Sequence, residues 1–582
     1  MKFLLVAINA KYIHSNPAVY SLKKYAGADM QEYIEIAEYT INQQMQDILA
    51  DIYTRKPDAV GFSCYIWNWN MIQCLLEELP KVLPDTDIWL GGPEVSYNGE
   101  DVLTRFPGVK GIMSGEGEQT FKELLEWYVQ GKLPDVEGIA GLYLRNGYTK
   151  ARDLIDLNDL PFLYGDLDRF ANRIIYYESS RGCPYRCSYC LSSIDKKVRL
   201  RKIETVKQEL QFFLDHKVKQ VKFVDRTFNC DHEHAVEIWR YIKENDNGVT
   251  NFHFEISADI LREEEIALLG SLRPGLAQLE IGVQSVNPET LQAINRRMDV
   301  ERLEKIVAAL RGNNNIHLHL DLIAGLPFED YDSFVTSFNW VYAMKPEQLQ
   351  LGFLKVLKGS PMAEKAEEYG VIHLSKPPYE VLSTKWLSYG DIMRLKRVEE
   401  MVELYYNSQQ FTHTLPILEQ VFDNAFALYE ALADYYEKRG FLVESPSRAY
   451  RYQILLEFAT ERDVTRRALY EEALLYDLYL RENLKSRPGF AGMLYETDVC
   501  KDFVRAFYRK EEKERTYLPA YAAYDWKQLS KMTHLEPFIY SVWDKEQALE
   551  GEIQYVLFDY QERNPLTYQA RTCIICAEEE CL

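Results

Sequence analysis

The chain lacks the features that would place it in a membrane or outside the cell. Its 582 residues contain no apolar run approaching the roughly 18 residues that a membrane-spanning helix needs. The apolar part of the N-terminus, MKFLLVAINAKYIHS, is too short and too strand-like for a signal peptide. Ten cysteines are few for this length, and most stand in two tight groups. This favours metal binding in a reducing compartment over a disulfide framework, so we expect a cytoplasmic protein.

Positive charge is also scarce. The chain has 67 Lys and Arg against 89 Asp and Glu, a net charge of -22, which argues against binding the phosphate backbone of nucleic acids. The local exception is the basic run formed by Lys196, Lys197, Arg199, Arg201 and Lys202. It fits either a solvated loop and helix start or a site for a carboxylate or an anionic substrate. The length predicts about three domains.

Residues 1–138 predict a doubly wound α/β domain. Strand-like runs at 2–8, 33–39, 59–65, 87–92 and 109–115 alternate with amphipathic helical patterns, which is typical of a parallel sheet covered on both faces. Such sheets bind ligands beyond the carboxyl ends of their strands, here segments 9–16, 64–70, 91–94 and 115–118. Several of these residues are small and allow close approach of a ligand. The candidate contacts are Asn9, Ser63, Gly91, Gly92, Gly115, Glu116 and Gly117.

A nicotinamide dinucleotide is disfavoured as the ligand of this domain. The first turn, NAKYIHSNP, lacks the GxGxxG fingerprint. The later GEGEQT carries two acids where a pyrophosphate would want none.

Cys183, Cys187 and Cys190 stand at a Cx3Cx2C spacing directly after a strand-like run. Three thiolates so close together can share one metal centre. Zinc sites and iron–sulfur cubanes usually take four protein ligands, but the next cysteine, Cys230, follows 40 residues later. A cluster held by these three would keep one iron open to an outside ligand. A structural zinc knuckle with a distant fourth ligand is the alternative.

From residue 174 the chain alternates six times between strands and helices. The strands are expected at 174–180, 218–225, 251–257, 276–283, 316–327 and 347–357. Six βα units predict an open, partial version of the (β/α)8 barrel, whose active residues lie at the C-terminal ends of the strands. Polar residues unusual for buried strands stand near those ends, namely Asp225, Glu255, Gln284, Arg296 and Asp321.

The cysteine motif, with Tyr189 before its third cysteine, resembles the signature of the radical S-adenosylmethionine (SAM) enzymes. The resemblance implies that Cys183, Cys187 and Cys190 bind a catalytic [4Fe-4S] cluster whose fourth iron chelates SAM. One electron, from a donor such as flavodoxin or ferredoxin, then cleaves SAM to a 5′-deoxyadenosyl radical. The resemblance also implies which other residues contact the cofactor, namely Tyr189, Asp225, Glu255, Gln284, Arg296 and Asp321.

The N-terminal domain, with its GGPE and GEGE loops ahead of such a core, resembles the cobalamin-binding domain of cobalamin-dependent radical SAM proteins. This implies cobalamin as a third cofactor, and it favours methylation of an unactivated carbon in an unidentified small-molecule or peptide substrate. Radical rearrangement without methyl transfer, and a non-catalytic sensor, are the alternatives. The DxHxxG motif is absent, so no histidine is expected below cobalt, although His14 lies in a suitable loop. Trp67 and Trp69 could pack near the corrin ring or belong to the core.

The remaining segments complete the predicted organisation. Residues 139–173 predict a β-hairpin with an Asn146-Gly147 turn and a linker, 174–374 the partial barrel, and 375–582 a mostly helical accessory domain. Paired strands are expected near EIQYVLFDYQERNP. At the C-terminus Cys573, Cys576 and Cys581, with Cys500 as a fourth ligand, could bind a metal, or they could be free thiols.

Replacing all three motif cysteines by alanine is expected to abolish both the visible sulfur-to-iron charge-transfer absorption and the cleavage of SAM, because thiolates supply every protein ligand of such a cluster. Absorption spectroscopy and chromatography of SAM products check this after anaerobic reconstitution. Persistent SAM cleavage in the triple variant would contradict the assignment.

Overall fold

The computed structural model describes residues 1–133, 135–484, 486–492, 497–545 and 547–575. These residues divide into two compact units. The first contains residues 1–316, 323–331 and 352–392, and the second contains 317–322, 332–351 and the described residues from 393 onward. Among the described residues, no helix combines the length and the apolar character that crossing a membrane requires.

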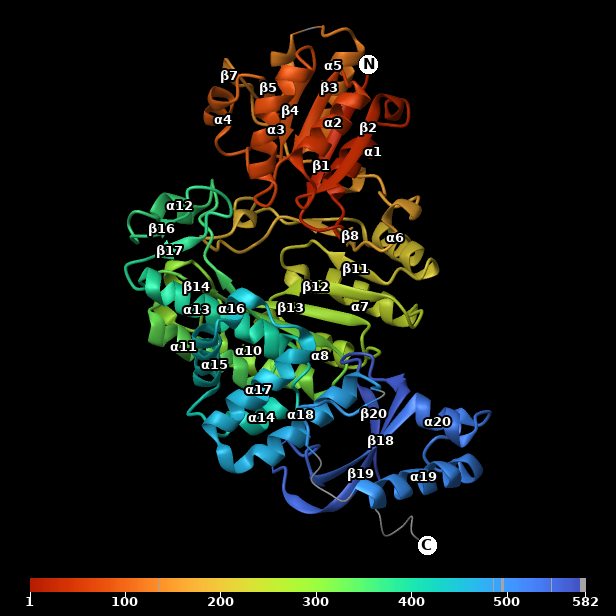
Figure 1. Ribbon diagram of the computed structural model, residues 1–582. Helices are drawn as coiled ribbons and strands as arrows, with labels where there is room; N and C mark the ends of the chain where they lie inside the picture. The colour runs from red at the N-terminus through yellow and green to blue at the C-terminus, as the bar shows by residue number, and fades with distance from the viewer. Residues whose placement is uncertain (134, 485, 493–496, 546, 576–582) are drawn as a thin grey trace. The chain divides into compact units, whose positions relative to one another are not determined.

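The first unit begins with a seven-stranded sheet in the order β2-β1-β3-β4-β5-β6-β7 (Figure 1). Strands β1 to β5 are parallel, and β6 and β7 are antiparallel additions at one edge. The order of the first five strands is that of flavodoxin-like doubly wound sheets. The strands are β1 (Phe3–Asn9), β2 (Ile34–Thr40), β3 (Ala59–Ser63), β4 (Asp87–Gly91), β5 (Val109–Met113), β6 (Leu142–Leu144) and β7 (Gly147–Tyr148).

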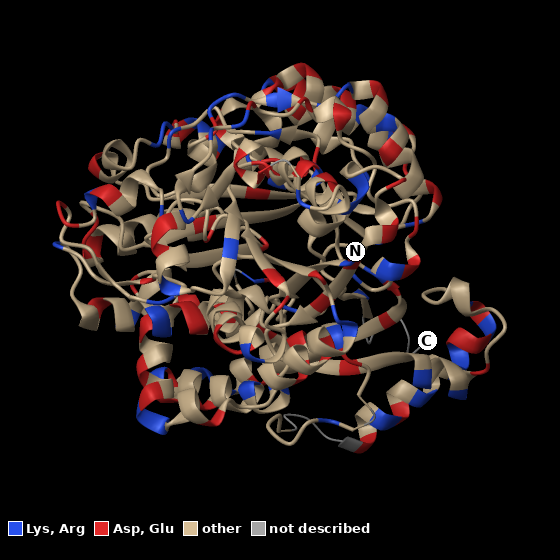
Figure 2. Ribbon diagram, turned by 90° about the horizontal axis from the view of Figure 1, so that it is seen from above, with Lys and Arg blue, Asp and Glu red and all other residues tan. Residues whose placement is uncertain are grey.

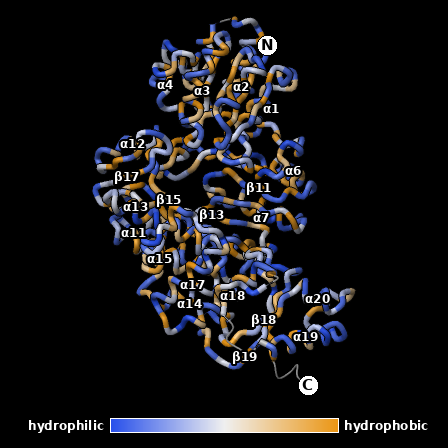
Figure 3. Tube along the Cα trace, viewed as in Figure 1, coloured by the Kyte–Doolittle hydropathy of each residue, from blue (hydrophilic) through white to orange (hydrophobic). Residues whose placement is uncertain are grey.

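Helices cover both faces of this sheet. They are α1 (Pro17–Tyr25), α2 (Met45–Arg55), α3 (Trp69–Val82), α4 (Gly99–Arg105) and α5 (Gly117–Val129). Successive residues of β1 point to opposite faces: Leu4 and Val6 pack in one hydrophobic cluster with α2 and α3, and Phe3 and Leu5 pack in another with α1 and α5. Figure 3 shows hydrophobic residues concentrated among these elements. The predicted doubly wound domain is therefore present.

The hairpin differs from its prediction by one residue. Leu144 pairs with Gly147, so the turn residues are Arg145 and Asn146 rather than Asn146 and Gly147. Gly147 itself takes the positive φ of 118°. Arg145 donates hydrogen bonds to the carbonyl oxygens of Pro107 and Val109, at 2.6 and 3.3 Å. This tertiary contact ties the turn to the neighbouring strand.

The second sheet of the chain has six strands in the order β15-β14-β13-β12-β11-β8. The pairs that join β8, β11, β12 and β13 are parallel. The strands are β8 (Ile175–Tyr177), β11 (Gln220–Phe223), β12 (Asn251–Ile256), β13 (Ala277–Gln284), β14 (His317–Ala324) and β15 (Gln348–Phe353). The main helices between them are α6 (Ile203–Asp215), α7 (His232–Glu244), α8 (Glu263–Gly270), α9 (Pro288–Ala293), α10 (Val300–Gly312) and α11 (Tyr331–Ala343).

Residues after β15 in the first unit form short elements, α12 (Pro361–Lys365), β16 (Ile372–His373) and β17 (Val381–Ser383), and lead into α13 (Tyr389–Met401). The second unit then continues as helices, as predicted. They include α14 (Thr414–Glu419), α15 (Ala425–Arg439), α16 (Phe441–Glu444), α17 (Arg448–Arg462), α18 (Arg467–Arg481), α19 (Thr497–Glu514) and α20 (Trp526–Met532). Charged residues of both signs are interspersed along helices and loops (Figure 2).

The C-terminal strands correct one expectation. EIQYVLFDYQERNP lies largely in one long strand, β19 (Glu550–Arg563), rather than in a pair. Its two antiparallel partners are β18 (Thr533–Tyr540) and β20 (Ala570–Ile575), which give a three-stranded sheet. Helix α18 connects this sheet to the helices. The carboxylate of Glu472 on α18 accepts hydrogen bonds from the backbone amides of Ile539, at 2.9 Å, and Tyr540, at 2.8 Å.

Leu90→Ala in β4 is expected to lower the free energy of unfolding by about 2–5 kcal/mol, because this fully buried side chain would leave a cavity. The matched control, Val82→Ala, removes a side chain that is 41% exposed and should change stability by less than about 1 kcal/mol. Denaturant unfolding followed by circular dichroism measures both. Equal effects of the two substitutions would contradict this view of the core.

Candidate functional site

The three motif cysteines lie in one loop between the short paired strands β9 (Ser180–Arg181) and β10 (Arg199–Leu200). Cys183 and Cys187 are buried, and Cys190 is partly exposed. Backbone hydrogen bonds fix the loop: Cys183 N donates to Asp195 O at 3.0 Å, and Ser188 N donates to Ile294 O at 2.9 Å. The loop therefore owes its shape to its neighbours.

A buried cation accompanies the thiols. Arg296 Nη1 lies 3.7 Å from Cys187 Sγ and 3.4 Å from the Tyr189 hydroxyl. Burial raises the pKa of the Cys187 thiol, and the positive charge of Arg296 opposes that rise. A neighbouring cation favours the thiolate, which is the form that binds metal. Three thiols on one loop with this cation form a donor set that fits an iron–sulfur cluster.

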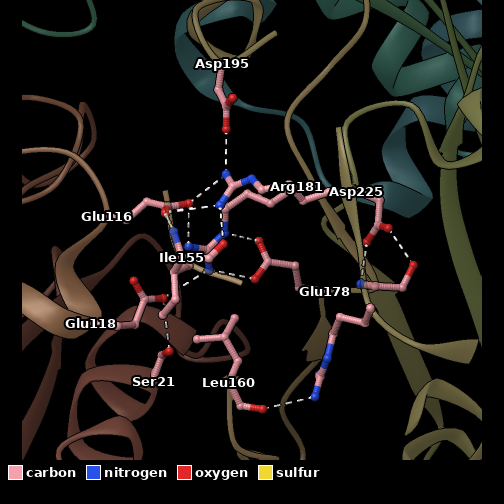
Figure 4. A network of polar contacts seen from close by, with 12 residues as sticks. Ser21, Glu116, Glu118, Ile155, Leu160, Glu178, Arg181, Asp195 and Asp225 are labelled. Atoms are coloured by element: carbon pink, nitrogen blue, oxygen red, sulfur yellow. Dashed lines mark hydrogen bonds and ion pairs between the residues drawn. The ribbon is translucent and has the colours of Figure 1, made fainter. Parts of the chain in front are cut away.

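Asp225, predicted to contact the cofactor, is directed at the start of the cysteine loop. Its carboxylate accepts hydrogen bonds from Ser179 N at 3.0 Å and from the hydroxyls of Ser179 and Ser180, both at 2.6 Å. Figure 4 shows the Asp225 side chain with dashed lines at its carboxylate. Burial raises the pKa of Asp225 to about 6, and these three hydrogen bonds oppose the rise. The contacts describe a carboxylate that fixes the backbone entering the cysteine loop.

Gln284, at the end of β13, has two unusual properties. Its φ is 74°, which non-glycine residues seldom adopt, and its buried Oε1 has no hydrogen-bond partner among the described residues. At Gly282 a Cβ atom would lie 2.4 Å from Gln284 Nε2. Backbone strain together with an unsatisfied buried polar atom is typical of a residue that contacts a ligand. Gln284 therefore fits a role in binding SAM.

The other predicted SAM contacts lie on neighbouring strands or in the second unit. Glu255 is on β12, and its Oε2 lies 3.7 Å from Arg226 Nη1. Arg296 Nη2 donates to the carbonyl oxygen of Gly282, two residues before Gln284. Asp321 belongs to the second unit, where its Oδ1 lies 3.0 Å from His319 Nε2.

A cavity of about 710 Å³ lies at the carboxyl ends of the N-terminal strands. Six of the seven predicted contacts in that domain line it, namely Ser63, Gly91, Gly92, Gly115, Glu116 and Gly117. Its deep part is apolar and is formed by Leu5, Val19, Leu22, Phe62 and Met113. Residues of the cysteine loop region complete the lining: Arg181, Leu191, Ile194 and Asp195.

The size and lining of this cavity fit part of a large cofactor such as cobalamin. Its volume is in the range of small-molecule sites, and it combines an apolar interior with a rim of glycine and serine backbone. Around Gly115 no atom lies within 4 Å of where a Cβ would stand, so the loop borders open space there. The apolar depth suits a flat hydrophobic group, and the rim suits amide side chains.

Segment 9–16, expected to bind the same ligand, does not line this cavity. Asn9 is buried and donates from Nδ2 to Glu38 Oε1 at 3.3 Å. His14 Nδ1 lies 2.6 Å from the hydroxyl of Tyr176 on β8, and burial lowers the pKa of His14. The segment therefore contacts the second sheet instead of the glycine loops.

The two tryptophans have different environments. Trp69 begins α3 and is buried against Phe106. Trp67 is 43% exposed and stacks on Tyr65, which lines the cavity, with ring centroids 4.3 Å apart. Trp69 therefore belongs to the core.

The basic run is largely occupied by the protein's own carboxylates. Arg199 pairs with Glu116 at 2.8 Å and with Asp195 at 2.7 Å. Arg201 is buried and pairs with Glu209 at 2.8 Å. Lys196, Lys197 and Lys202 are exposed. The structure thus favours the structural interpretation for the two arginines.

Sequence reasoning missed a charged cluster on the sheet itself. Glu280 Oε2 lies 3.0 Å from Lys222 Nζ and 2.9 Å from His253 Nε2, and these residues come from three adjacent strands. Burial opposes ionisation of Glu280, but its interactions with His253 and Lys222 outweigh burial and lower its pKa to about 2. Charged residues that alternate with apolar ones within the strands were the available signal.

At the C-terminus, Cys500 is buried in a hydrophobic cluster against which Cys573 packs. Such surroundings suit thiols in a core. The other two cysteines of the predicted group, Cys576 and Cys581, lie outside the described residues.

Comparison with known families agrees with the two cofactor domains. A B12 binding domain matches residues 4–125, and the Radical SAM superfamily matches residues 177–341. A family described as Protein of unknown function (DUF4080) matches residues 367–558. The chain therefore contains a B12 binding domain followed by a Radical SAM superfamily domain. The predicted domain families and the predicted fold class are confirmed at the level of these domains.

Similar proteins include named methyltransferases. The cobalamin-dependent radical SAM methyltransferase TokK of Streptomyces tokunonensis is 27% identical over 353 residues, which cover 56% of this chain and 51% of TokK. The 2-(S-pantetheinyl)-carbapenam-3-carboxylate methyltransferase of Streptantibioticus cattleyicolor is 25% identical, over 75% of this chain and 68% of that protein. The chain thus spans about half the length of the first relative and two thirds of the second.

Two solved structures have the same fold over much of the chain. The cobalamin-dependent SAM radical enzyme OxsB, with aqua-cobalamin and SAM bound, gives a TM-score of 0.54 at 14% identity and covers 82% of this chain and 78% of its own. The radical SAM methyltransferase TsrM of Kitasatospora setae, with cobalamin and a [4Fe-4S] cluster bound, gives 0.52 at 18% identity and covers 64% of this chain and 76% of its own.

Gly92→Ala is expected to destabilise the cavity rim by about 2–4 kcal/mol, because φ is 107° and a Cβ would lie 2.5 Å from Cys64 O. Gly115→Ala is the control: its φ of 80° is also positive, but its Cβ would meet no atom within 4 Å, so about 1 kcal/mol is expected. Denaturant unfolding measures both. A larger effect at Gly115 would contradict the described packing.

Proposed function

We propose that this protein is a cobalamin-dependent radical SAM methyltransferase that methylates an unactivated carbon. The observation that carries the proposal is the shared lining of the 710 Å³ cavity: glycine loops of the N-terminal sheet form one side, and residues next to the cysteine motif form another. A ligand over the glycine loops would therefore lie beside the loop that holds the cluster. Relatives that carry the name methyltransferase, one of them described as cobalamin-dependent and radical SAM, support this proposal.

The proposed cofactors supply the chemistry when bound: the cluster and SAM generate a radical on the substrate, and cobalamin carries the methyl group. Cys183, Cys187 and Cys190 would hold the cluster and leave one iron for SAM. Arg296 would stabilise the thiolate of Cys187, from which it lies 3.7 Å away. The reaction would also require an external one-electron reductant, such as flavodoxin or ferredoxin.

The residues at the ends of the strands would orient SAM. Gln284 offers an unpartnered buried oxygen, and Glu255 offers a carboxylate near the end of β12. Fixed polar contacts of this kind set the direction of the sulfonium relative to the cluster. The apolar depth of the cavity, including Leu5 and Phe62, would exclude water from the other cofactor.

Single replacements Glu255→Gln, Gln284→Ala, Arg296→Gln and Asp321→Asn are expected to weaken SAM binding by about 5- to 30-fold, since each removes one polar contact worth about 1–2 kcal/mol. Cluster iron per chain should remain unchanged. Equilibrium binding and iron analysis after anaerobic reconstitution measure the two quantities. Loss of iron in all four variants would point to a structural role instead.

The reaction class is tested by the fate of SAM. Anaerobic protein reconstituted with iron, sulfide and cobalamin, and supplied with a one-electron reductant such as reduced flavodoxin, should convert SAM into both S-adenosylhomocysteine and 5′-deoxyadenosine, and omission of cobalamin should remove the first product. Abortive cleavage without substrate is subtracted. Formation of 5′-deoxyadenosine with little S-adenosylhomocysteine would instead indicate rearrangement without methyl transfer. Failure to bind cobalamin at micromolar supply would remove cobalamin from the proposal.

A further inference from the structure

Two arginines flank the cysteine loop and face each other across its base. Arg181 on β9 and Arg199 on β10 are directly paired in the antiparallel ladder. Like charges in such a position repel one another, so the arrangement needs carboxylates to offset it. Figure 4 shows the carboxylates that surround this pair, namely those of Glu116, Glu118, Glu178 and Asp195.

Both arginines bind the same carboxylate, and it belongs to the cavity rim. Glu116 lies in the loop between β5 and α5; its Oε1 is 3.0 Å from Arg181 Nη1 and 2.8 Å from Arg199 Nη2. Its Oε2 accepts a hydrogen bond from the amide of Ile155 at 2.8 Å. Burial opposes ionisation of Glu116, but the hydrogen bonds from Arg199 and Ile155 and the charge of Arg181 together lower its pKa.

The donors of Arg181 are almost entirely used. Beyond Glu116, its Nη2 lies 3.0 Å from Glu118 Oε1 and 2.8 Å from Glu178 Oε2, and its Nε donates to Glu178 Oε1 at 2.9 Å. Glu118 comes from the start of α5, and Glu178 directly follows β8. The planar guanidinium of Arg181 therefore connects the rim of the cavity, through Glu116 and Glu118, with Glu178, which lies just before strand β9.

A second connection reaches the cysteine loop from its other end. Arg199 Nη2 donates to Asp195 Oδ2 at 2.7 Å, and Asp195 O accepts the backbone hydrogen bond of Cys183 at 3.0 Å. The chain of contacts thus runs from Glu116 through Arg199 and Asp195 to the first cysteine. Glu116, Arg181 and Asp195 also line the cavity.

From these contacts we infer that Arg181 and Glu116 are positioning residues: they hold the glycine-rich rim loop 115–118 against the cysteine loop and so set how a cofactor over the rim lies relative to the cluster. This role rests on the proposed function. In this role Glu116 and Glu118, the acidic residues of the GEGE loop, bind the protein's own arginines. The sequence had instead predicted that Glu116 contacts the cofactor.

The balance of charges makes the contact between the rim loop and the cysteine loop sensitive to the loss of Arg181. Arg181 and Arg199 face four carboxylates, those of Glu116, Glu118, Glu178 and Asp195. Removing Arg181 leaves Glu118 and Glu178 without this cation, and it leaves Glu116 paired with Arg199 alone. Repulsion among these three carboxylates would loosen the contact between the rim and the cysteine loop.

The test begins with cofactor-free protein and hydrogen–deuterium exchange. Arg181→Gln and the isosteric Glu116→Gln are expected to accelerate amide exchange in segments 111–118 and 183–199 by about tenfold, because the restraint between the two loops is lost. The matched control is Arg152→Gln: Arg152 pairs with Glu123, is 17% exposed where Arg181 is 22% exposed, and does not line the cavity. It should leave exchange in both segments within about twofold of the parent.

A functional readout then separates positioning from general stability. With iron per chain unchanged, Arg181→Gln should lower the ratio of S-adenosylhomocysteine to 5′-deoxyadenosine by about tenfold, and Arg181→Lys should recover part of it, because lysine restores the charge but not the fork. Unchanged exchange in both segments would overturn the inference, even if cobalamin binds. If the parent protein binds no cobalamin, the proposed function is overturned. The exchange experiment would still test whether Arg181 and Glu116 hold the two loops together, because it uses cofactor-free protein.

Discussion

The candidate site depends on a buried carboxylate that fixes the entry to an otherwise irregular loop. Asp225 accepts three hydrogen bonds from Ser179 and Ser180, directly before the strand that carries Arg181. Burial makes the charged form costly, as its pKa of about 6 shows, so the three donors are needed to hold it. The cysteine loop contains only one short 3-10 helix, Leu191–Ser193, so contacts of this kind are needed to hold its shape.

A second set of contacts connects the N-terminal sheet with the cysteine loop region in the first unit. Parallel strands present their carboxyl ends at one edge, so the N-terminal sheet opens its cavity where its strands end. The cysteine loop contributes Leu191, Ile194 and Asp195 to that cavity, and the ion pairs of Glu116 join the same loop to its rim. The ion pairs of Glu116 therefore connect the rim of the cavity with the two short strands that flank the cysteine loop.

Local pattern was enough to predict the sheets and the cysteine motif, because strand and helix periodicities and thiol spacing are written in short stretches of sequence. It also predicted Gln284 at a strand end, but not the strained φ or the unpartnered oxygen, which arise from packing. That Asn9 contacts the cofactor stays a prediction; its hydrogen bond to Glu38, which comes from the next strand of the sheet, could not be predicted from the local pattern. Strands β18 and β20 were missed because their pairing with β19 is long-range and leaves little local signal.

In the proposed enzyme one chain holds cobalamin beside a [4Fe-4S] cluster. Electron paramagnetic resonance tests this on anaerobic protein loaded with both cofactors, with cobalt as Co(II) and the cluster reduced. We expect a through-space spin interaction that alters both signals and disappears when Cys183, Cys187 and Cys190 are replaced by alanine. A spectrum equal to the sum of the two singly loaded proteins would contradict it.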